Sequence, residues 1–361
     1  MHTIKKKVAI VGTQGVPAKY GGFETLVENL LGINCPDNVH YTVFCSSSDY
    51  KNKIQTYKEA TLKYIPLHAN GYQSILYDII SMIRCIGKYD VLLILGVSGC
   101  IFLPILRLCF YGRIIVNIDG LEHRRNKWGK YTKKFLKLSE KTAIKYADVI
   151  ITDNKGIQDY VQNEYNMDSE MIAYGGDHVL CKISDQETDE ILSSYNILKN
   201  DYSFSVCRIE PENNVHLILS AFEHTNKTIV FVGNWLASDY GKKIYEKYKE
   251  YDNIKLLSPI YDTKILNVFR SNCKFYLHGH SAGGTNPSLV EAMFFGKPIL
   301  AYDVVYNKET TEYKANYFSN EKELIALLDL ENYQDNAYAM KEIAQKRYKW
   351  KTIANEYVNL Y

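Results

Sequence analysis

The sequence predicts an α/β protein built from two doubly wound, Rossmann-like halves. The chain has 361 residues, which is too long for one ordinary core and suits two domains of roughly 150–200 residues each. Short β-branched apolar runs alternate with longer amphipathic segments, as they do in parallel βα units. This alternation restarts after a polar stretch at 174–200, so each half is expected to form its own sheet.

The composition is that of a globular protein. Apolar residues make up 46% of the chain and charged residues 23%, so disorder is not expected. The net charge of +2 excludes a chain that attracts polyanions as a whole, and any such attraction must be local. The eight cysteines form no C-x-x-C pair and several lie in apolar runs, which favours reduced, buried thiols over disulfides or a zinc site.

No membrane span is predicted. The longest uncharged stretch, 91–106, contains Gly96, Gly99 and Pro104 and is shorter than the ~18–20 residues that a span needs. It is predicted to form a buried strand, a loop and a helix. The apolar run after the basic N-terminus is too short for a signal peptide. We therefore expect a soluble, cytoplasmic protein that is able to touch a membrane surface.

In the first half the apolar runs predict five strands and two helices. The strands are 8–12, 41–45, 91–95, 114–118 and 148–152, and the helices are 23–31 and 75–86. Runs that are apolar on both faces are typical of a buried parallel sheet.

The second half repeats the pattern. The predicted strands are 204–209, 228–233, 254–257, 274–279 and 298–302, with helices at 215–222, 242–251, 263–270 and 287–295. The polar stretch 174–200 is the predicted linker, and a long last helix, 337–360, could cross back to the first half. The predicted domains are 1–175 and 176–340, with 341–361 returning to the first domain. Two such sheets would face each other across a cleft and bind ligands at the carboxyl ends of their strands.

The segment HGHSAGGTNPSLVEAMFFGKP is the most informative in the chain. Asn286 is a favoured N-cap and Pro287 a favoured first helical residue. A glycine-bearing loop that leads into a helix start can bind an anion, and a diphosphate fits such a site. Glu291 could then accept hydrogen bonds from a ribose or sugar hydroxyl. The alternative is a plain strand–loop–helix connection with Glu291 in solvent.

CRIEPENN places Arg208 at the end of the first strand of the second half. A guanidinium at the carboxyl edge of a parallel sheet can hold a diphosphate with two hydrogen bonds. The alternative is an exposed arginine that pairs with Glu210 or Glu212.

The combination of R-I-x-P-E, a glycine-rich loop and S-L-V-E-A-M closely resembles the C-terminal domain of glycosyltransferase family 4, whose members are retaining enzymes of the GT-B architecture. The segments VAIVGTQGVPAKYGGFETLVENL and VNIDGLEHRRNKWGKY resemble a subgroup of bacterial polysaccharide rhamnosyltransferases. That subgroup includes enzymes that add rhamnose from dTDP-rhamnose to a lipid-linked glucose in capsule assembly. The resemblance covers nearly the whole chain. It implies that Arg208 contacts the donor diphosphate, that Gly284, Thr285 and Asn286 line the phosphate loop, and that Glu291 holds the nucleoside sugar hydroxyls.

Two positions depart from the pattern of the broad family. Asn213 stands where a lysine usually supplies a second cation to the diphosphate. Gly283 stands where the first glutamate of an E-x7-E motif usually contacts the donor hexose. The missing glutamate is compatible with a deoxysugar donor and equally with weakened activity.

In the first half the loop after the first strand lacks G-x-G-x-x-G, which argues against a nicotinamide dinucleotide site. In the resembled family, the positions of Gly21, Gly22 and Glu24 approach the donor phosphate or the acceptor. Glu24 could instead simply favour the positive end of its helix. Asp119 follows a strand and could orient or deprotonate an acceptor hydroxyl, or could only form an Asp-Gly turn. The subgroup commonly has tryptophan at His123, so no catalytic role is assigned to this histidine.

The segment 124–146 is strongly basic and contains aromatic residues at helical spacing. Its lysines are Lys130, Lys133, Lys134, Lys137, Lys141 and Lys145, and its apolar stripe is Trp128, Tyr131, Phe135, Leu138 and Tyr146. This pattern suits an anionic membrane surface. The alternative is a helix that packs its apolar stripe on the sheet and leaves its lysines in water. No recognition module for nucleic acid accompanies the basic segment.

The predicted reaction is transfer of a deoxyhexose, L-rhamnose from dTDP-rhamnose, to a polyprenyl-diphosphate-linked saccharide at the inner face of the plasma membrane. No metal and no other cofactor is expected, because the chain has no D-x-D motif. Arg208, Asp119 and Glu24 are the candidate catalytic residues. The alternatives are a transferase that uses a UDP- or GDP-sugar, a nucleotide-sugar epimerase or hydrolase, and a nucleotide-sugar-binding protein with little or no catalysis.

Overall fold

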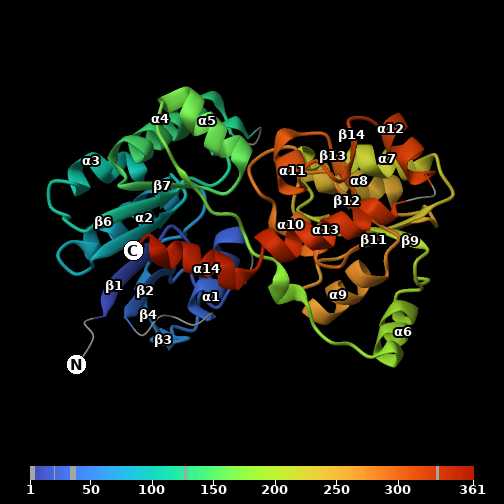
Figure 1. Cartoon of the computed structure of the whole chain (residues 1–361), viewed down its shortest axis with the longest axis horizontal. Coiled ribbons are helices and arrows are strands. Elements are labelled where there is room, and N and C mark those ends of the chain that lie inside the picture. Colours follow the sequence, from blue (N-terminus) through green and yellow to red (C-terminus); the bar gives the residue numbers. More distant parts are fainter. Residues whose placement is uncertain (1–4, 20, 33–37, 126–127, 331–332) are drawn as a thin grey trace. The chain divides into compact units, whose positions relative to one another are not determined.

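The computed structural model describes residues 5–19, 21–32, 38–125, 128–330 and 333–361 (Figure 1). The chain divides into two compact units. The first unit is Met1–Tyr174 together with Trp350–Tyr361, and the second is Gly175–Lys349.

The first unit contains an eight-stranded sheet with the order β3-β4-β2-β1-β5-β6-β7-β8. The strands are β1 (Lys6–Val11), β2 (Val39–Ser46), β3 (Thr56–Tyr57), β4 (Ala60–Ile65), β5 (Val91–Leu95), β6 (Arg113–Asn117), β7 (Val149–Thr152) and β8 (Glu170–Met171). Every neighbouring pair is parallel except the hairpin β3–β4. In the centre of the sheet Val8 lies between Tyr41 and Val91, and all five residues of β5 are buried. The runs predicted to be apolar on both faces therefore form the middle of a parallel sheet, as expected.

The helices of the first unit connect these strands. They are α1 (Gly22–Gly32), α2 (Gln73–Cys85), α3 (Leu103–Leu106), α4 (Lys130–Tyr146), α5 (Lys155–Tyr165) and α14 (Trp350–Asn359), with 3-10 turns η1 (Cys100–Phe102) and η2 (Glu122–Arg124). The uncharged stretch 91–106 forms β5, η1 and α3, which confirms the predicted strand, loop and helix. No helix in the described part of the chain is both long and apolar enough to span a membrane.

The second unit contains a six-stranded, wholly parallel sheet with the order β11-β10-β9-β12-β13-β14. The strands are β9 (Tyr202–Val206), β10 (Thr228–Val232), β11 (Ile254–Leu257), β12 (Phe275–His278), β13 (Ile299–Tyr302) and β14 (Asn316–Phe318). From β9 the chain winds outward in one direction, and from β12 it winds in the other. The boundary between β9 and β12 is thus the topological switch point, where ligands bind in sheets of this kind.

In its described residues the second unit has eight helices. They are α6 (Asp185–Ser194), α7 (Val215–Glu223), α8 (Asp239–Tyr248), α9 (Thr263–Asn272), α10 (Pro287–Met293), α11 (Val305–Thr310), α12 (Glu321–Leu328) and α13 (Gln334–Arg347), with 3-10 turns η3 (Asp177–Val179) and η4 (Pro211–Asn213) among the described residues. The predicted linker 174–200 therefore contains η3 and α6 and, from Gly175 on, is part of the second unit.

The predicted last helix, 337–360, is two helices. Tyr348 ends α13, and its hydroxyl donates to the carbonyl of Thr310, 2.8 Å away, within the second unit. Buried Trp350, Ile353 and Tyr357 of α14 belong to the core of the first unit. Figure 1 shows α14, in red, among the blue elements of that unit. The segment that returns therefore begins at residue 350 rather than 341, because the buried side chains change core at that point.

The seven cysteines in the described residues are free thiols, as expected. Cys45, Cys85, Cys100 and Cys273 are buried, as predicted for the thiols in apolar runs, whereas Cys109 and Cys181 are exposed. Cys35 lies outside the described residues.

Candidate functional site

The loops that follow β9 and β12 meet at the switch point of the second sheet. The Asn214 side chain donates to the carbonyl of Gly279 at 2.8 Å, and the Ser281 hydroxyl donates to the carbonyl of Glu212 at 2.8 Å. A Cβ at Gly279 would collide with the carbonyl of Asn213, so this close approach requires glycine. The two loops therefore form one cross-linked platform at the carboxyl edge of the sheet.

Asn213 lies inside this platform. Its Nδ2 donates to the carbonyl of Arg208 at 2.6 Å, and its Oδ1 lies 2.7 Å from Nδ1 of His280. Both Asn213 and His280 are buried. The residue that replaces the family's lysine is thus used to hold the backbone of Arg208 and does not extend toward solvent.

Arg208 lies two residues beyond β9 and extends from the platform. Its side chain is 41% exposed, and Nη1 lies 3.8 Å from Oε1 of Glu210. The predicted pairing with Glu210 is present only at this long distance. Among the described residues the guanidinium has no closer ion pair, which leaves N–H groups of its fork for a ligand at the switch point.

The loop after β12 leads into α10, and Asn286 is its N-cap with Pro287 in the first turn, as predicted. The Asn286 side chain accepts from the backbone N–H of Ser288 at 3.0 Å, and its carbonyl accepts from Leu289 at 3.1 Å. Pro287 has no N–H and the N–H groups of Ser288 and Leu289 donate to Asn286, so the described donors of the first turn of α10 are already used. An anion bound here would depend on the loop 283–286, where Gly283 has a φ of +97° and Thr285 is buried.

Glu291 of α10 is held by two basic side chains that the sequence did not reveal. Nη2 of Arg270 in α9 donates to Oε2 at 2.5 Å, and Nε2 of His178 in η3 lies 3.5 Å from Oε1. Arg270 is only 4% exposed, so this ion pair is shielded from water. Burial lowers the pKa of His178, and the nearby Glu291 carboxylate partly offsets that effect. Glu291 therefore does not lie freely in solvent, in contrast to the alternative that its helix position suggested.

Gly176 explains how His178 reaches Glu291. A Cβ at Gly176 would lie 2.9 Å from Cγ1 of Val290 and 3.0 Å from the backbone nitrogen of Glu291. Only a residue without a side chain lets this segment pack so closely on α10. The paired glycines of the predicted linker were the one available signal, and they mark a close approach of backbones rather than a flexible connection.

In the first unit Glu24 holds the loop that follows β1. Its Oε1 accepts from the Thr13 hydroxyl at 2.9 Å and from the backbone N–H of Gln14 at 2.8 Å. Gly21 has a φ of +126°, and a Cβ there would collide with the other oxygen of Glu24. Gly22 begins α1. The structure thus gives Glu24 and Gly21 a role in loop geometry, and their contact with a ligand stays a prediction.

Asp119 follows β6 in a left-handed conformation, with a φ of +59°. Its backbone N–H donates to Oδ1 of Asn117 at 3.0 Å, and Nδ2 of Asn117 donates to the Tyr357 hydroxyl of α14 at 2.8 Å. Aspartate tolerates this backbone region better than most residues, and such conformations are concentrated at functional sites. Asp119 is therefore positioned by the returning helix at the carboxyl edge of the first sheet.

His123 lies beside α4 and is paired with a buried acid. Its Nδ1 is 2.9 Å from Oε2 of Glu140, whose other oxygen accepts from the hydroxyls of Tyr160 and Tyr165 at 2.7 and 2.6 Å. Burial raises the pKa of Glu140, but the hydrogen bonds from His123, Tyr165 and Tyr160 outweigh burial and lower it. His123 thus anchors the segment before α4, which fits the absence of a predicted catalytic role.

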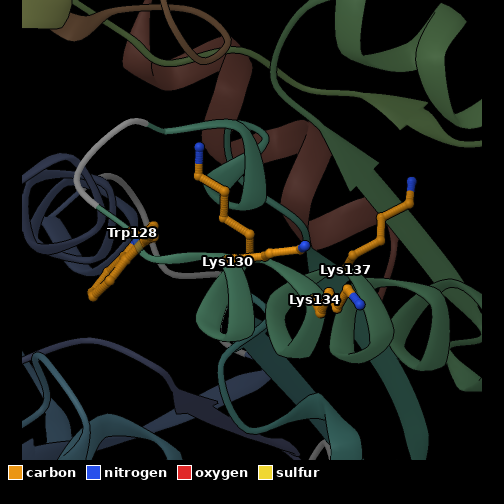
Figure 2. A pocket seen from close by; sticks show the side chains of 5 residues that line it. Trp128, Lys130, Lys134 and Lys137 are labelled. Carbon is orange, nitrogen blue, oxygen red and sulfur yellow. The ribbon is translucent and has the colours of Figure 1, made fainter.

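The basic segment becomes helical only at Lys130, and its first two turns line a surface pocket. The pocket has a volume of about 500 Å³ and is lined by Trp128, Lys130, Lys133, Lys134 and Lys137. Figure 2 shows the indole of Trp128 before the first turn and the labelled lysines projecting from the helix.

The apolar stripe predicted for this helix does not form its packed face. The buried face consists of Leu136, Ser139, Glu140, Thr142, Ala143 and Ile144. Tyr131 is 87% exposed and Leu138 is 53% exposed. The alternative in which these two side chains pack on the sheet is therefore wrong.

Two family models match separate parts of the chain. Residues 5–177 match a domain of unknown function, DUF1972, and residues 187–334 match the family described as glycosyl transferases group 1. Arg208, Arg270, the loop 283–286 and Glu291 all lie within the segment that matches this second model, whereas His178 lies just before it. No curated protein matches the chain.

Solved structures share the fold over almost the whole length. Sucrose-phosphate synthase from Thermosynechococcus elongatus is 14% identical with a TM-score of 0.82, over 99% of this chain and 98% of that one. Anabaena HepE in complex with UDP and glucose is 16% identical with a TM-score of 0.75, over 99% of both chains. Starch synthase IV from Arabidopsis thaliana, bound to ADP and acarbose, is 12% identical with a TM-score of 0.70, over 99% of this chain and 98% of that one. The chain has the two-domain α/β fold of the GT-B glycosyltransferases, which confirms the predicted fold class.

Proposed function

We propose that this protein is a retaining glycosyltransferase that moves a deoxyhexose from a nucleotide sugar to a lipid-linked saccharide. The donor is L-rhamnose carried by dTDP, and the acceptor is a polyprenyl-diphosphate-linked sugar of a bacterial surface polysaccharide. The observation that carries the proposal is the half-exposed Arg208, fixed at the switch point of a group 1 glycosyl transferase domain.

The geometry of the second unit supports a diphosphate at this point. Asn213 holds the backbone of Arg208, which fixes the point from which the side chain extends. The guanidinium can then donate two hydrogen bonds to diphosphate oxygens. Charge that develops on the leaving diphosphate would be stabilised by Arg208 and by the loop Gly284, Thr285 and Asn286. Since Asn213 is occupied within the platform, Arg208 would carry this role without the family's second cation.

Glu291 would hold the ribose hydroxyls of the donor. Arg270 contacts one carboxylate oxygen of Glu291 and His178 contacts the other, so the carboxylate is oriented before the donor binds. Preorganised groups lose less freedom on binding, so this arrangement favours affinity.

Gly283 supports a deoxyhexose as the donor sugar. With no side chain where the family usually contacts hexose hydroxyls, the loop makes no demand for those hydroxyls, which a deoxyhexose lacks in part. A UDP-sugar is the second candidate, because HepE has been solved with UDP-glucose and shares this fold.

The acceptor side lies in the first unit. Asp119, with Glu24 holding the loop after β1, would orient the acceptor hydroxyl, and the leaving phosphate would help to take its proton. The exposed Tyr131 and Leu138 beside the lysines of α4 would rest on the anionic inner face of the plasma membrane, where a lipid-linked acceptor is found.

The nucleotide is tested by thermal unfolding with dTDP, UDP, GDP and ADP. A ligand that binds only the folded chain adds about 2.7 kcal/mol at 100 times its dissociation constant. Selective stabilisation by dTDP supports the rhamnosyl assignment, and selective stabilisation by UDP replaces the sugar. No stabilisation by any of the four would contradict the proposed donor site.

The reaction is tested with Arg208→Ala. Loss of one such donor at an anionic leaving group lowers the rate by about 10²–10³-fold. Transfer from the preferred nucleotide sugar is measured with wild type and variant, with Lys242→Ala as an exposed control in the same unit. A variant that keeps full transfer activity would overturn the assignment.

A further inference from the structure

The pocket at the start of α4 concentrates positive charge that the described residues do not neutralise. Among its lysines, only Lys137 has carboxylate partners in the described part of the chain, with Nζ 2.9 Å from Glu164 and 3.5 Å from Glu140. Lys130, Lys133 and Lys134 have no carboxylate within ion-pair distance among the described residues. Three uncompensated ammonium groups around one pocket repel one another, and a multiply charged anion would relieve that repulsion.

Lys137 fixes one side of the pocket. It is held by Glu140 and Glu164 and lies 4.8 Å above the ring of Tyr160, in the buried cluster that also anchors His123. One wall of the pocket is therefore rigid, while Lys130 and Lys134 extend from the outer face (Figure 2). Because Lys137 is held in place and Lys130 and Lys134 can adjust, the pocket suits a compact anion better than a flat surface.

The indole of Trp128 supplies an apolar side. Its Nε1 donates to Glu122 at 3.0 Å, which fixes the ring beside the lysines (Figure 2). This arrangement suits a ligand with a charged head group and an apolar chain, because the lysines can bind the head group and the indole can pack against the chain.

The position in the fold places this pocket near the chemistry. In a parallel α/β sheet the segment that follows a strand lies at the carboxyl edge, so the start of α4, which follows β6, lies at the same edge as Asp119. Asp119 and Trp128 both lie in the connection between β6 and α4, and the pocket lysines lie in the first two turns of α4.

We infer that the pocket of Trp128, Lys130, Lys133, Lys134 and Lys137 binds the diphosphate of an isoprenoid-diphosphate lipid, with Trp128 against the first part of its apolar chain. The identity of this ligand rests on the proposed function, since a lipid-linked acceptor carries such a diphosphate. The site would hold the acceptor by its carrier while Asp119 orients its sugar.

The test uses geranyl diphosphate, a short isoprenoid diphosphate, titrated calorimetrically into the full chain at about 0.15 M salt. We expect Lys130→Gln/Lys134→Gln to weaken binding by about tenfold or more, since each lost charge-assisted contact contributes measurably. The matched control is Lys141→Gln/Lys145→Gln, which removes the same charge from exposed positions of the same helix outside the pocket. We expect the control to change the affinity less than about twofold.

Two further arms separate the ligand sources. Nucleoside diphosphate binding should be unchanged in Lys130→Gln/Lys134→Gln, and geranyl diphosphate binding should be unchanged in Arg208→Ala. If both lysine double variants lose affinity equally, the charge of the whole helix binds the anion and the inference is wrong. If Lys130→Gln/Lys134→Gln loses only its binding to phosphatidylglycerol vesicles, the pocket binds phospholipid headgroups and the inference is again wrong. If the wild-type chain binds geranyl diphosphate but no nucleoside diphosphate, that result would contradict the proposed function alone.

Discussion

Two polar side chains, Asn213 and Glu291, determine how the candidate donor site of the second unit is held. Asn213 joins the loop after β9 to the loop after β12 through Arg208 and His280. Glu291 joins α10 to α9 and to the start of the second unit through Arg270 and His178. Each is satisfied by partners from another element, so neither can be replaced without leaving a buried partner group unpaired.

Asn213→Ala should lower the free energy of unfolding of the second unit by about 2–3 kcal/mol, because it leaves the Arg208 carbonyl and the His280 ring without their partner. Urea unfolding followed by intrinsic fluorescence measures the change. Asn234→Ala, at a position in the same unit with no side-chain hydrogen bond described, is the control. Equal stability of Asn213→Ala and wild type would show that the two contacts do not hold the platform.

Asp78 in α2 should make the stability of the first unit depend on pH. Its Oδ2 accepts from the backbone N–H of Gly99 at 3.1 Å, but burial dominates and raises the pKa from 3.8 to about 8. Between about pH 4 and 8 the folded state retains a proton that the unfolded state has lost. Stability therefore falls as pH rises through this range, by at most about 1.4 kcal/mol per pH unit from this group.

Asp78→Asn removes that titration and keeps an oxygen for Gly99. The free energy of unfolding, measured from pH 5 to 8, should fall less steeply with pH in the variant than in wild type, and the variant should gain most at pH 8. Identical slopes would mean that Asp78 is ionised in the folded state.

At the scale of elements, α4 has one buried face and one exposed face. Its inner face carries the buried Leu136, Ala143 and Ile144, while its outer face exposes Tyr131 and Leu138 beside lysines. The apolar pattern in the sequence has two candidate stripes. Packing in the fold decides which one is buried.

Tyr131→Ser/Leu138→Ser should reduce binding to vesicles of phosphatidylglycerol by about tenfold or more, because two apolar anchors are lost, each contributing about 1–2 kcal/mol. Stability should change little, since both side chains are exposed. Co-sedimentation with vesicles measures the binding.

The control for this experiment is Leu236→Ser/Tyr261→Ser, which removes side chains that are 67% and 68% exposed in the second unit. Equal losses in the two double variants would mean that apolar exposure anywhere on the chain is sufficient and that α4 has no special role.

At the scale of the whole molecule, the chain leaves the first unit at Tyr174, builds the second unit and returns at Trp350. The twelve returning residues carry buried Trp350, Ile353, Ala354 and Tyr357 of the first core, and Tyr357 also supports Asn117 next to Asp119. The first unit is therefore complete only after the second has been synthesised.

Truncation after Lys349 should destabilise the first unit and leave the second intact. Differential scanning calorimetry should show loss or marked lowering of one transition, with the other unchanged, because α14 contributes side chains to only one core. Equal lowering of both transitions would show that the units do not unfold separately. Nucleoside diphosphate should still stabilise the remaining transition if the donor site lies wholly in the second unit.

Local sequence patterns are sufficient to predict the central strands of both sheets and the cap of α10. Apolar runs such as 91–95 and 228–232 are local, strongly β-prone and apolar on both faces, so their period and composition suffice to locate strands. Asn286 and Pro287 likewise act on their own helix start. β4 and β14 were missed because their residues alternate or form only a short edge, and neither is a continuous apolar run.

The pairing of polar side chains depends on tertiary contacts. Glu291 is joined by Arg270 and His178 from two other elements, and Asn213 contacts His280 in the loop after β12. Tertiary contacts also place α14 in the first core and leave Tyr131 and Leu138 exposed. These contacts join residues far apart in the chain, and a local pattern carries no information about which distant side chain will fill a given space.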